Sequence, residues 1–424
     1  MVRAVATPAV QRRAWLERAF LHGVAECHPD NGLAPLLPKA PTQGRTWVFG
    51  AGKAAAAMAA VVHARLPGAV GLVVTRYHHV TEQPTGDIRV VEAAHPVPDS
   101  ESVVAGEQML TMAKRVAPDD RVLFLFSGGG SALLCVPLAG ISVEQKRAAT
   151  RFLLASGAPI EQINCVRKHL SSIKGGRLGQ AVTATDVQTY VISDVVGDDP
   201  RDVASGPSIA PRTTPEDAIR TLRDYAYPAL SELLEPMRAA AAVQIAPHPV
   251  HVVGRASAAL SAIERFVAAE GWHVINLGDA ITGDATKVGE QHAKLVRHYS
   301  AEKRPIALVS GGELTVKIRN PAGRGGPNLE YLASLVTHLD RVPDFEALAC
   351  DSDGIDGSED NAGAYVSSTT LRRAELAGLD VRVSLRNNDT YSLFHRLGDL
   401  VVTGPTCTNV NDLRIILINI NAEM

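Results

Sequence analysis

Two glycine turns in this sequence have the residue types that bind anions. Each follows a short apolar run, residues 122–126 in one case and 306–309 in the other. Consecutive glycines allow backbone N–H groups to approach a phosphate or carboxylate closely, and flanking serine hydroxyls can add hydrogen bonds. The residues concerned are Ser127, Gly128, Gly129, Gly130 and Ser131 in the first turn and Ser310, Gly311 and Gly312 in the second.

Lys53 stands in a third glycine turn, at the predicted start of a helix. The segment GAGKAA, with Gly50 and Gly52, fits the loose dinucleotide pattern G-x-G-x-x-A. The acidic residue expected about 20 residues later is missing; Arg76 stands there, and an arginine could suit the 2′-phosphate of NADP. A phosphate-binding P-loop is excluded, because alanine follows the lysine. A lysine at a helix N-terminus suits a phosphate or a carboxylate.

Two aspartates, Asp194 and Asp353, lie in loops that follow predicted strands. Carboxylates at strand ends can hold Mg²⁺, which prefers one or two carboxylates together with substrate phosphates. The run DSDGIDG also resembles a calcium loop, but its twelfth position would be Ala362 instead of glutamate. Aspartate is also common in glycine-rich turns for local hydrogen bonding alone, so a structural role stays open.

Basic residues gather in two further segments. Lys168 lies in the run RKH, and a second run, KGGR, ends at Arg177. Arg324 lies among glycines in RNPAGRGGPNLE, just before a predicted helix. An arginine on a flexible glycine loop can fold over a transferring phosphoryl group. A solvated loop explains the same segment equally well.

Strand and helix patterns alternate along the chain, which predicts an α/β protein with mostly parallel sheets. The 22 residues 122–143 carry no charge, yet the three glycines and Pro137 argue against a membrane helix and for a strand, a turn and a helix start. Ligands of such sheets bind beyond the carboxyl ends of the strands. The predicted strands are residues 46–49, 71–74, 88–91, 122–126, 189–192, 250–253, 274–277, 306–309, 348–350 and 400–402.

The two halves of the chain share this outline, so we expect two Rossmann-like α/β domains with the active site in a cleft between them. We place the boundary in the Ala- and Pro-rich segment 236–249, which gives domains 1–242 and 243–424. The net charge of −3 gives no sign of a nucleic-acid or membrane partner. Five scattered cysteines without a C-x-x-C pair suit a reducing cytoplasm.

The sequence resembles the glycerate 2-kinases whose C-terminal module is called MOFRL, here at about residues 305–418. The resemblance covers nearly the whole chain, and many motifs follow in one order. They are VFGAGKAA, AAHPVPD, FSGGGSALL, INCVRKHLSSIKGGRL, ISDVVGDDPRDVASGPS, VSGGELTV, GRGGPNLE, DSDGIDG and TGPTCTNVNDL.

This resemblance implies transfer of the γ-phosphoryl group of ATP to the 2-hydroxyl of D-glycerate, with Mg²⁺. Lys53 and Arg324 would neutralise charge, and Asp194 and Asp353 would hold Mg²⁺ or accept the hydroxyl proton. Lys168 and the glycine turns would bind the substrates. Some relatives are named hydroxypyruvate reductase, so an NAD(P)H-dependent reductase is the alternative, and a non-catalytic sensor of sugar acids is a weaker one. The sequence leaves the oligomeric state open.

Three positions depart from the family pattern. Pro327 and Leu329 replace an arginine and a glutamine in the motif around Arg324, so Arg324 would bind the anion alone or with Arg319. Cys407 replaces a glycine. If this position needs a positive φ, cysteine is strained there.

Overall fold

The computed structural model of the chain describes residues 8–419, except 42, 303 and 341–343. It forms two compact units, of which the first is Pro29–Val253. The second joins the segment before Pro29 to the segment from Gly254 onward. This division differs from the predicted domains 1–242 and 243–424, because the N-terminal helix α1 (Pro8–Glu26) packs on α11 (Ala256–Ala268). The rings of Trp15 and Phe266 lie 5.6 Å apart in this contact.

The first unit contains a six-stranded sheet in the order β3-β2-β1-β4-β5-β6. The pairs from β3 to β5 are all parallel. This order confirms the predicted Rossmann-like fold for this unit. Its strands are β1 (Thr46–Ala51), β2 (Val70–Arg76), β3 (Asp87–Ala93), β4 (Arg121–Phe126), β5 (Asp186–Ile192) and β6 (Val250–Gly254).

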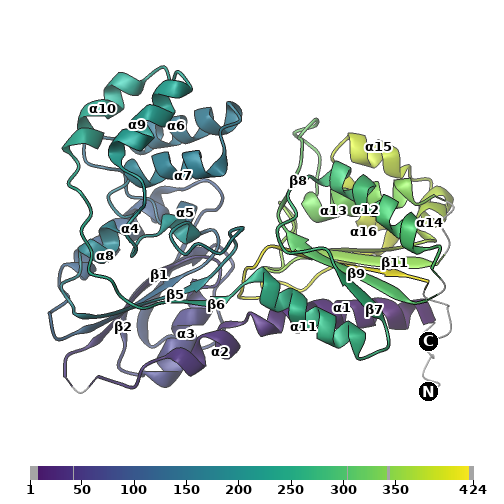
Figure 1. Ribbon diagram of the computed structural model, residues 1–424, viewed down its shortest axis with the longest axis horizontal. Helices are drawn as coiled ribbons and strands as arrows, with labels where there is room; N and C mark the ends of the chain where they lie inside the picture. Colours follow the sequence, from purple (N-terminus) through teal and green to yellow (C-terminus); the bar gives the residue numbers. More distant parts are fainter. Residues whose placement is uncertain (1–7, 42, 303, 341–343, 420–424) are drawn as a thin grey trace. The chain divides into compact units, whose positions relative to one another are not determined.

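Helices cover both faces of this sheet, as Figure 1 shows, with α3 on one face and α4, α5 and α8 on the other. Alternate side chains of each strand point to opposite faces of the sheet, and each face has an apolar core. Phe49 and Phe124 belong to the core beneath α4, while Val48 and Leu123 are buried on the opposite face. The helices α6, α7, α9 and α10 form a further layer with its own apolar core. The helical segments are α2 (Pro29–Gly32), η1 (Ala34–Leu36), α3 (Ala55–Arg65), α4 (Ser100–Ala113), α5 (Gly130–Leu133), α6 (Val143–Ala155), α7 (Ile160–His169), α8 (Arg177–Gln180), η2 (Val203–Ser205), α9 (Pro215–Asp224) and α10 (Leu230–Ala239).

The second unit also has a six-stranded sheet, in the order β13-β12-β11-β14-β9-β7. Within the described strands of this six-stranded sheet, β7 and β9 pair parallel and the other four pairs are antiparallel. The prediction of a mostly parallel sheet is therefore wrong for this unit. The strands are β7 (His273–Asn276), β9 (Ile306–Gly312), β11 (Phe345–Asp351), β12 (Gly363–Ser367), β13 (Leu400–Val401) and β14 (Asp412–Ile418), with the short pair β8 (Gly283–Asp284) and β10 (Leu314–Thr315) apart from them.

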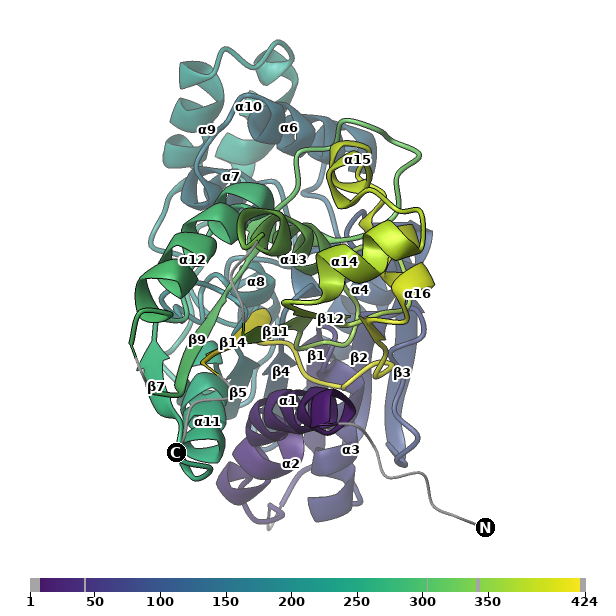
Figure 2. The same ribbon diagram turned by 90° about the vertical axis from the view of Figure 1, so that its right-hand side faces the viewer.

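Two strands that the sequence analysis did not include explain this difference. The strand β14 inserts between β9 and β11 and runs antiparallel to both, and β12 pairs with β11 on its other side. As Figure 2 shows, α1 and α11 cover one face of this sheet and α12 and α13 cover the other. The remaining bounds are α12 (Ala285–Tyr299), α13 (Pro327–His338), α14 (Thr370–Leu376), α15 (Val381–Arg386) and α16 (Thr390–Leu397).

The uncharged residues 122–143 do not form a membrane helix. They begin in β4, pass through the glycine turn and α5, and end at the start of α6. Within the described part of the chain, no helix is long and apolar enough to cross a membrane.

Candidate functional site

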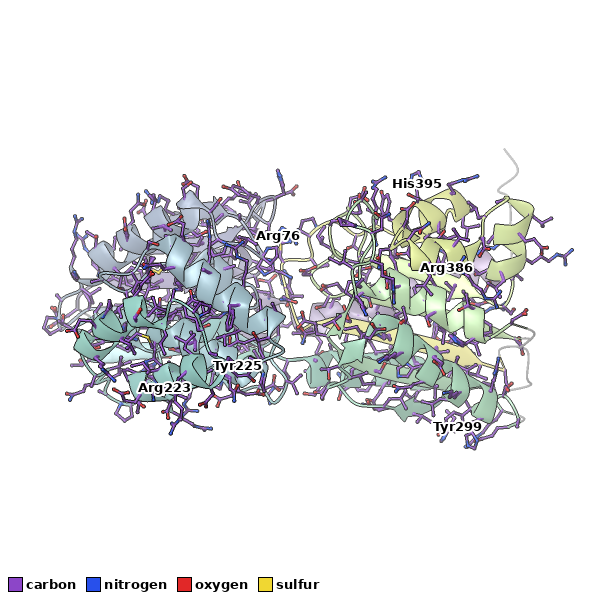
Figure 3. The ribbon with its side chains drawn as sticks, turned by 90° about the horizontal axis from the view of Figure 1, so that it is seen from above. Arg76, Arg223, Tyr225, Tyr299, Arg386 and His395 are labelled. Atoms are coloured by element: carbon purple, nitrogen blue, oxygen red, sulfur yellow. The ribbon has the colours of Figure 1, made fainter. Side chains whose placement is uncertain are left out.

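The turns after β1 and β4 lie side by side in the first unit. These two strands are neighbours, and the strand order reverses between them, which is where α/β sheets place their ligands. Lys53 follows β1 and the Ser127–Ser131 turn follows β4, so both predicted segments meet at this point. Arg76 ends the adjacent strand β2, where a dinucleotide-binding protein would carry an acidic residue (Figure 3).

The β4 turn accepts the two backbone N–H groups that directly precede α3 (Ala55–Arg65). The N–H of Lys53 donates to the carbonyl of Gly128 at 2.9 Å, and the N–H of Ala54 donates to the hydroxyl of Ser127 at 3.0 Å. A Cβ on Gly52 would overlap the Ser127 side chain, so glycine is needed here for the approach of the two turns. The sequence predicted that this helix start would offer free N–H groups to an anion. These two N–H groups already have acceptors.

The side chain of Lys53 lies beside the glycine turn. Gly129 has a φ of 79°, and a Cβ added there would lie 3.3 Å from the Cγ of Lys53 and 3.1 Å from the ring of His95. The half-buried groups Lys53 and His95 therefore flank the same turn from two sides. His95 was not predicted as a site residue, although it lies in the motif AAHPVPD. Its short distance to Gly129 depends on the fold, and spacing in the sequence does not reveal it.

Ser131 connects the glycine turn to a strained segment. Its hydroxyl oxygen lies 2.9 Å from that of Ser205. Ala204 and Ser205 have φ values of 52° and 62°, in the left-handed region that non-glycine residues rarely adopt. Such strain persists only where the surrounding structure enforces it, and it often occurs at functional sites.

Lys168 and Asp194 also belong to the first unit. Lys168 is buried, and its Nζ lies 2.6 Å from Oδ1 of Asp202, so a carboxylate already balances its charge. Asp194 is half-buried and follows β5. The hydroxyl of Ser193 accepts the N–H of Val195 at 3.3 Å, which holds the loop beside Asp194.

Ser310, Gly311 and Gly312 do not form a loop after β9 but belong to the strand itself. They are buried and pair with the start of β14. The N–H of Gly311 donates to the carbonyl of Gly278 at 2.8 Å. A Cβ on Gly312, whose φ is 116°, would overlap the backbone of Ile281. The glycines therefore permit close packing of backbone here, and their predicted contact with substrate stays a prediction.

Asp353 is fully buried in the second unit. Its Oδ1 accepts the N–H of Ile355 at 2.7 Å, and its own N–H donates to Oδ1 of Asp351 at 2.9 Å. These are the local bonds that favour aspartate in turns, which is the structural alternative considered for this loop. A role of Asp353 in metal binding or proton transfer stays a prediction.

Asp356, in the same loop, fixes the start of α13. Its two oxygens accept the N–H groups of Asn328 and Leu329, both at 3.0 Å. Burial first, and then the negative charge of Asp412, raise the pKa of Asp356 to about 7. The sequence pattern did not single out this residue as different from its neighbours, because its burial depends on packing against α13.

Arg324 lies before α13 and is half-exposed. Its Nη2 lies 2.6 Å from Oε2 of Glu359, and its guanidinium carbon lies 4.5 Å from the centre of the Tyr391 ring. The hydrogen bond to Glu359 raises the pKa of Arg324, which therefore stays charged. The glycine-rich loop thus presents a cation, as predicted from its composition, although a carboxylate already pairs with it.

The structure shows how each of the three residues that depart from the family pattern fits its surroundings. Pro327 is the first residue of α13, where proline costs no hydrogen bond. Leu329 is buried in the core beneath α13. Cys407 has a φ of 60°, so the predicted strain of a cysteine at this position is confirmed.

The acidic residues give Mg²⁺ few protein ligands in either unit. Among the described residues, no group of three or more His, Cys, Asp or Glu side chains could hold a metal ion. Mg²⁺ does not require such a group, because it binds one or two carboxylates and takes its remaining ligands from water and substrate phosphates. Asp194 and Asp353 lie in different units, so their joint use stays a prediction, as does the cleft between the units.

Comparison with known proteins gives consistent matches over almost the whole chain. Residues 15–239 match a domain of unknown function, DUF4147, and residues 306–412 match the MOFRL family. A protein of Agrobacterium vitis with the provisional name hydroxypyruvate reductase is 43% identical, over 96% of this chain and 95% of that protein. The D-glycerate 2-kinase of Thermotoga maritima is 35% identical, over 92% of this chain and 94% of that protein. The crystal structure of glycerate kinase from T. maritima superimposes with a TM-score of 0.84 at 32% identity, covering 96% of this chain and all of that one.

Proposed function

The chain belongs to the family of glycerate kinases that carry a MOFRL domain, and we propose on this basis that it is a glycerate 2-kinase. It transfers the γ-phosphoryl group of ATP to the 2-hydroxyl of D-glycerate and releases 2-phospho-D-glycerate and ADP. The relative from T. maritima is named D-glycerate 2-kinase, and the crystal structure from the same organism is named glycerate kinase.

One observation favours the kinase over a reductase. In a dinucleotide-binding fold the pyrophosphate binds to free N–H groups at the start of the first helix after β1. Here Ser127 and Gly128 accept the N–H groups of Ala54 and Lys53, the two residues just before α3, so the β4 turn lies directly against that helix start. The acidic residue that would bind the ribose of NAD is missing as well, since β2 ends in Thr75 and Arg76; this argues against NAD, whereas an arginine there suits NADP. What remains beside the turn is the ammonium group of Lys53, which suits a phosphoryl group.

In the proposed reaction, catalysis comes mainly from positioning and charge neutralisation. Lys53 stabilises the negative charge that develops on the transferring group, next to the backbone of the Gly128–Gly130 turn. Arg324 contributes a second cation, for which Glu359 acts as the counter-ion in the present arrangement. Mg²⁺, when bound with ATP, supplies further charge neutralisation at the phosphates.

The carboxylates have two proposed tasks. Asp194 is half-buried at a strand end and suits Mg²⁺. Asp353 or Asp194 accepts the proton of the 2-hydroxyl. We also propose that the protein acts in the cytoplasm, because all five cysteines are free thiols and four of them are buried.

The kinase and the reductase can be separated on one purified preparation. We expect ADP to form when D-glycerate and ATP are added, and no oxidation of NADH or NADPH when hydroxypyruvate is added. Hydride transfer at a substantial rate without ATP turnover would show that the reductase is the correct function.

A further inference from the structure

Five cations gather in the first unit where α6 and α7 meet the segment before α8. Three lysines are buried, with 6% of Lys146, 7% of Lys168 and 1% of Lys174 exposed. Two arginines, Arg167 and Arg177, are half-buried. We call Lys146, Arg167, Lys174 and Arg177 the basic cluster. Lys168 is set apart from it, because Asp202 pairs with Lys168 at 2.6 Å.

The members of the basic cluster act on one another electrostatically. The charges of Arg167 and Arg177 disfavour the charged form of Lys146, and those of Lys146 and Arg167 disfavour the charged form of Lys174. Burial is the largest cause and lowers the pKa of both lysines. The described residues thus place two buried lysines, whose charged form is disfavoured, within electrostatic range of two arginines.

Of the residues in the basic cluster, Lys146 has the position that is least favourable for the stability of the fold. Its Nζ is buried without a hydrogen-bond partner among the described residues. It is also the fourth residue of α6, near the positive end of that helix. A buried lysine without a partner lowers stability whether it keeps its charge or gives up its proton, and an anion beside its Nζ would remove that cost. The C-terminal end of α7 favours Arg167, but it does not account for Lys146.

Lys174 connects the cluster to the candidate active site. Its Nζ donates to the carbonyl of Ser131 at 2.8 Å and to that of Leu134 at 2.7 Å. These carbonyls belong to the helical turn that follows Gly128–Gly130. The third N–H of the ammonium group remains available for a ligand. A group bound by the cluster would therefore lie close to the backbone of the glycine turn.

From this arrangement we propose that Lys146, Arg167, Lys174 and Arg177 form a binding site for a phosphate group, next to the turn after β4. A phosphate fits better than a carboxylate, because it carries up to two negative charges and can accept bonds from several donors at once. The guanidinium groups can bind two of its oxygens in parallel, and the buried ammonium groups the others. The proposal extends the proposed kinase function, in which phosphate groups enter as ATP and leave as ADP and phosphoglycerate.

Calorimetry and thermal melting with inorganic phosphate test the site without relying on activity. The variant Lys146→Met removes the unpartnered amine, and we expect it to melt at the same temperature as the parent or higher. It should bind phosphate at least about tenfold more weakly, as expected for loss of a contact between charged groups. Arg167→Met should weaken phosphate binding similarly. Arg151→Met, which alters an exposed arginine on α6, should leave it unchanged.

Competition experiments show which molecule brings the phosphate group to the site. ADP or 2-phosphoglycerate is added to the protein with inorganic phosphate bound, at constant ionic strength set with chloride. Displacement of phosphate by either one supports the site and identifies the molecule that brings the phosphate group. Absence of phosphate binding in the parent, or unchanged binding together with a lower melting temperature in Lys146→Met, would overturn the proposal. Displacement by neither molecule would also overturn it. If the parent phosphorylates glycerate but does not bind phosphate here, the proposed site is wrong and the proposed function stands. If the parent binds phosphate here but does not phosphorylate glycerate, the site stands and the proposed function is wrong.

Discussion

Lys53 is the residue on which the proposed charge neutralisation depends most directly. Replacement by methionine keeps the length of the side chain and removes its charge. We expect Lys53→Met to fold normally and to lower kcat by about 10²–10³, the usual cost of losing one contact that stabilises the transition state. Arg65→Met, at the exposed end of α3, the helix that follows Lys53, is the matched control. Equal kcat/KM values for Lys53→Met and the parent would exclude this role.

A substitution at Asp194 tests whether this residue binds Mg²⁺. We expect Asp194→Asn to need a higher Mg²⁺ concentration for half-maximal rate, because an amide lacks the negative charge that holds a hard cation. Asp198→Asn, a change at a half-buried position in the same loop, should leave the Mg²⁺ dependence as it is. The measurement is a titration of rate against Mg²⁺ for all three proteins. Superimposable curves would mean that Asp194 is a structural residue.

Some site residues could be predicted from the sequence, but their hydrogen-bond partners and contacts could not. Lys53 and the Ser127–Ser131 turn each follow a predicted strand, so the sequence places both at the carboxyl ends of strands, where ligands bind. That their two strands are neighbours is known only from the structure. The contact of His95 with this turn and the burial of Lys146 depend on packing between distant segments. Spacing along the chain carries no signal for such contacts.

Among the elements, the approach of the β1 and β4 turns is the most sensitive to a small change. Gly52 has a φ of 141°, and a methyl group there would overlap Ser127. We expect Gly52→Ala to separate the two turns, lower the melting temperature and abolish most activity. Gly68→Ala, at a position with open space around it, should change neither. Thermal melting and kinase rates of the two variants give the comparison, and a fully active Gly52→Ala protein would contradict the described junction.

The contact between α12 and α13 predicts a pH effect on stability. His292 is buried there, with its Nδ1 2.8 Å from the hydroxyl of Tyr331, and burial lowers its pKa to about 4. Between pH 6.5 and 4 the unfolded chain binds a proton that the folded protein excludes, so stability falls as the pH falls. The effect amounts to at most about 3 kcal/mol.

The variant His292→Gln should show a weaker loss of stability over this pH range than the parent. The exposed change His298→Gln, on the same helix, should retain the parent's pH dependence. Denaturant unfolding at several pH values between 4 and 7 measures both. Identical slopes for His292→Gln and the parent would show that folding does not lower the pKa of His292.

At the same scale, the sequence predicted most strands of the first unit because its parallel strands are unbroken apolar runs. In the second unit it missed β12 and β14. The run Ile415–Leu417 inside β14 is apolar and could have signalled a strand. Its antiparallel place between β9 and β11 is a matter of long-range pairing, which a local pattern does not contain.

For the whole molecule, the α/β class and the family could be predicted from the sequence, whereas the division into units could not be fully predicted. The helix α1 is amphipathic and would suit either unit by composition. Its assignment to the second unit rests on contacts with partners more than 200 residues away, such as Phe266 and Glu346. Such contacts place a terminal helix only once the fold is known.

The central claim is that ATP phosphorylates the 2-hydroxyl of D-glycerate, and the position of the new phosphate tests it most directly. The two hydroxyl oxygens of glycerate lie only a few ångströms apart, so precise positioning must select between them. The purified protein is mixed with D-glycerate, ATP and Mg²⁺, and the product is passed to enolase and pyruvate kinase without phosphoglycerate mutase. We predict that pyruvate forms at once, because enolase accepts 2-phosphoglycerate directly. Pyruvate that forms only after the mutase is added, or no pyruvate in either case, would contradict the claim.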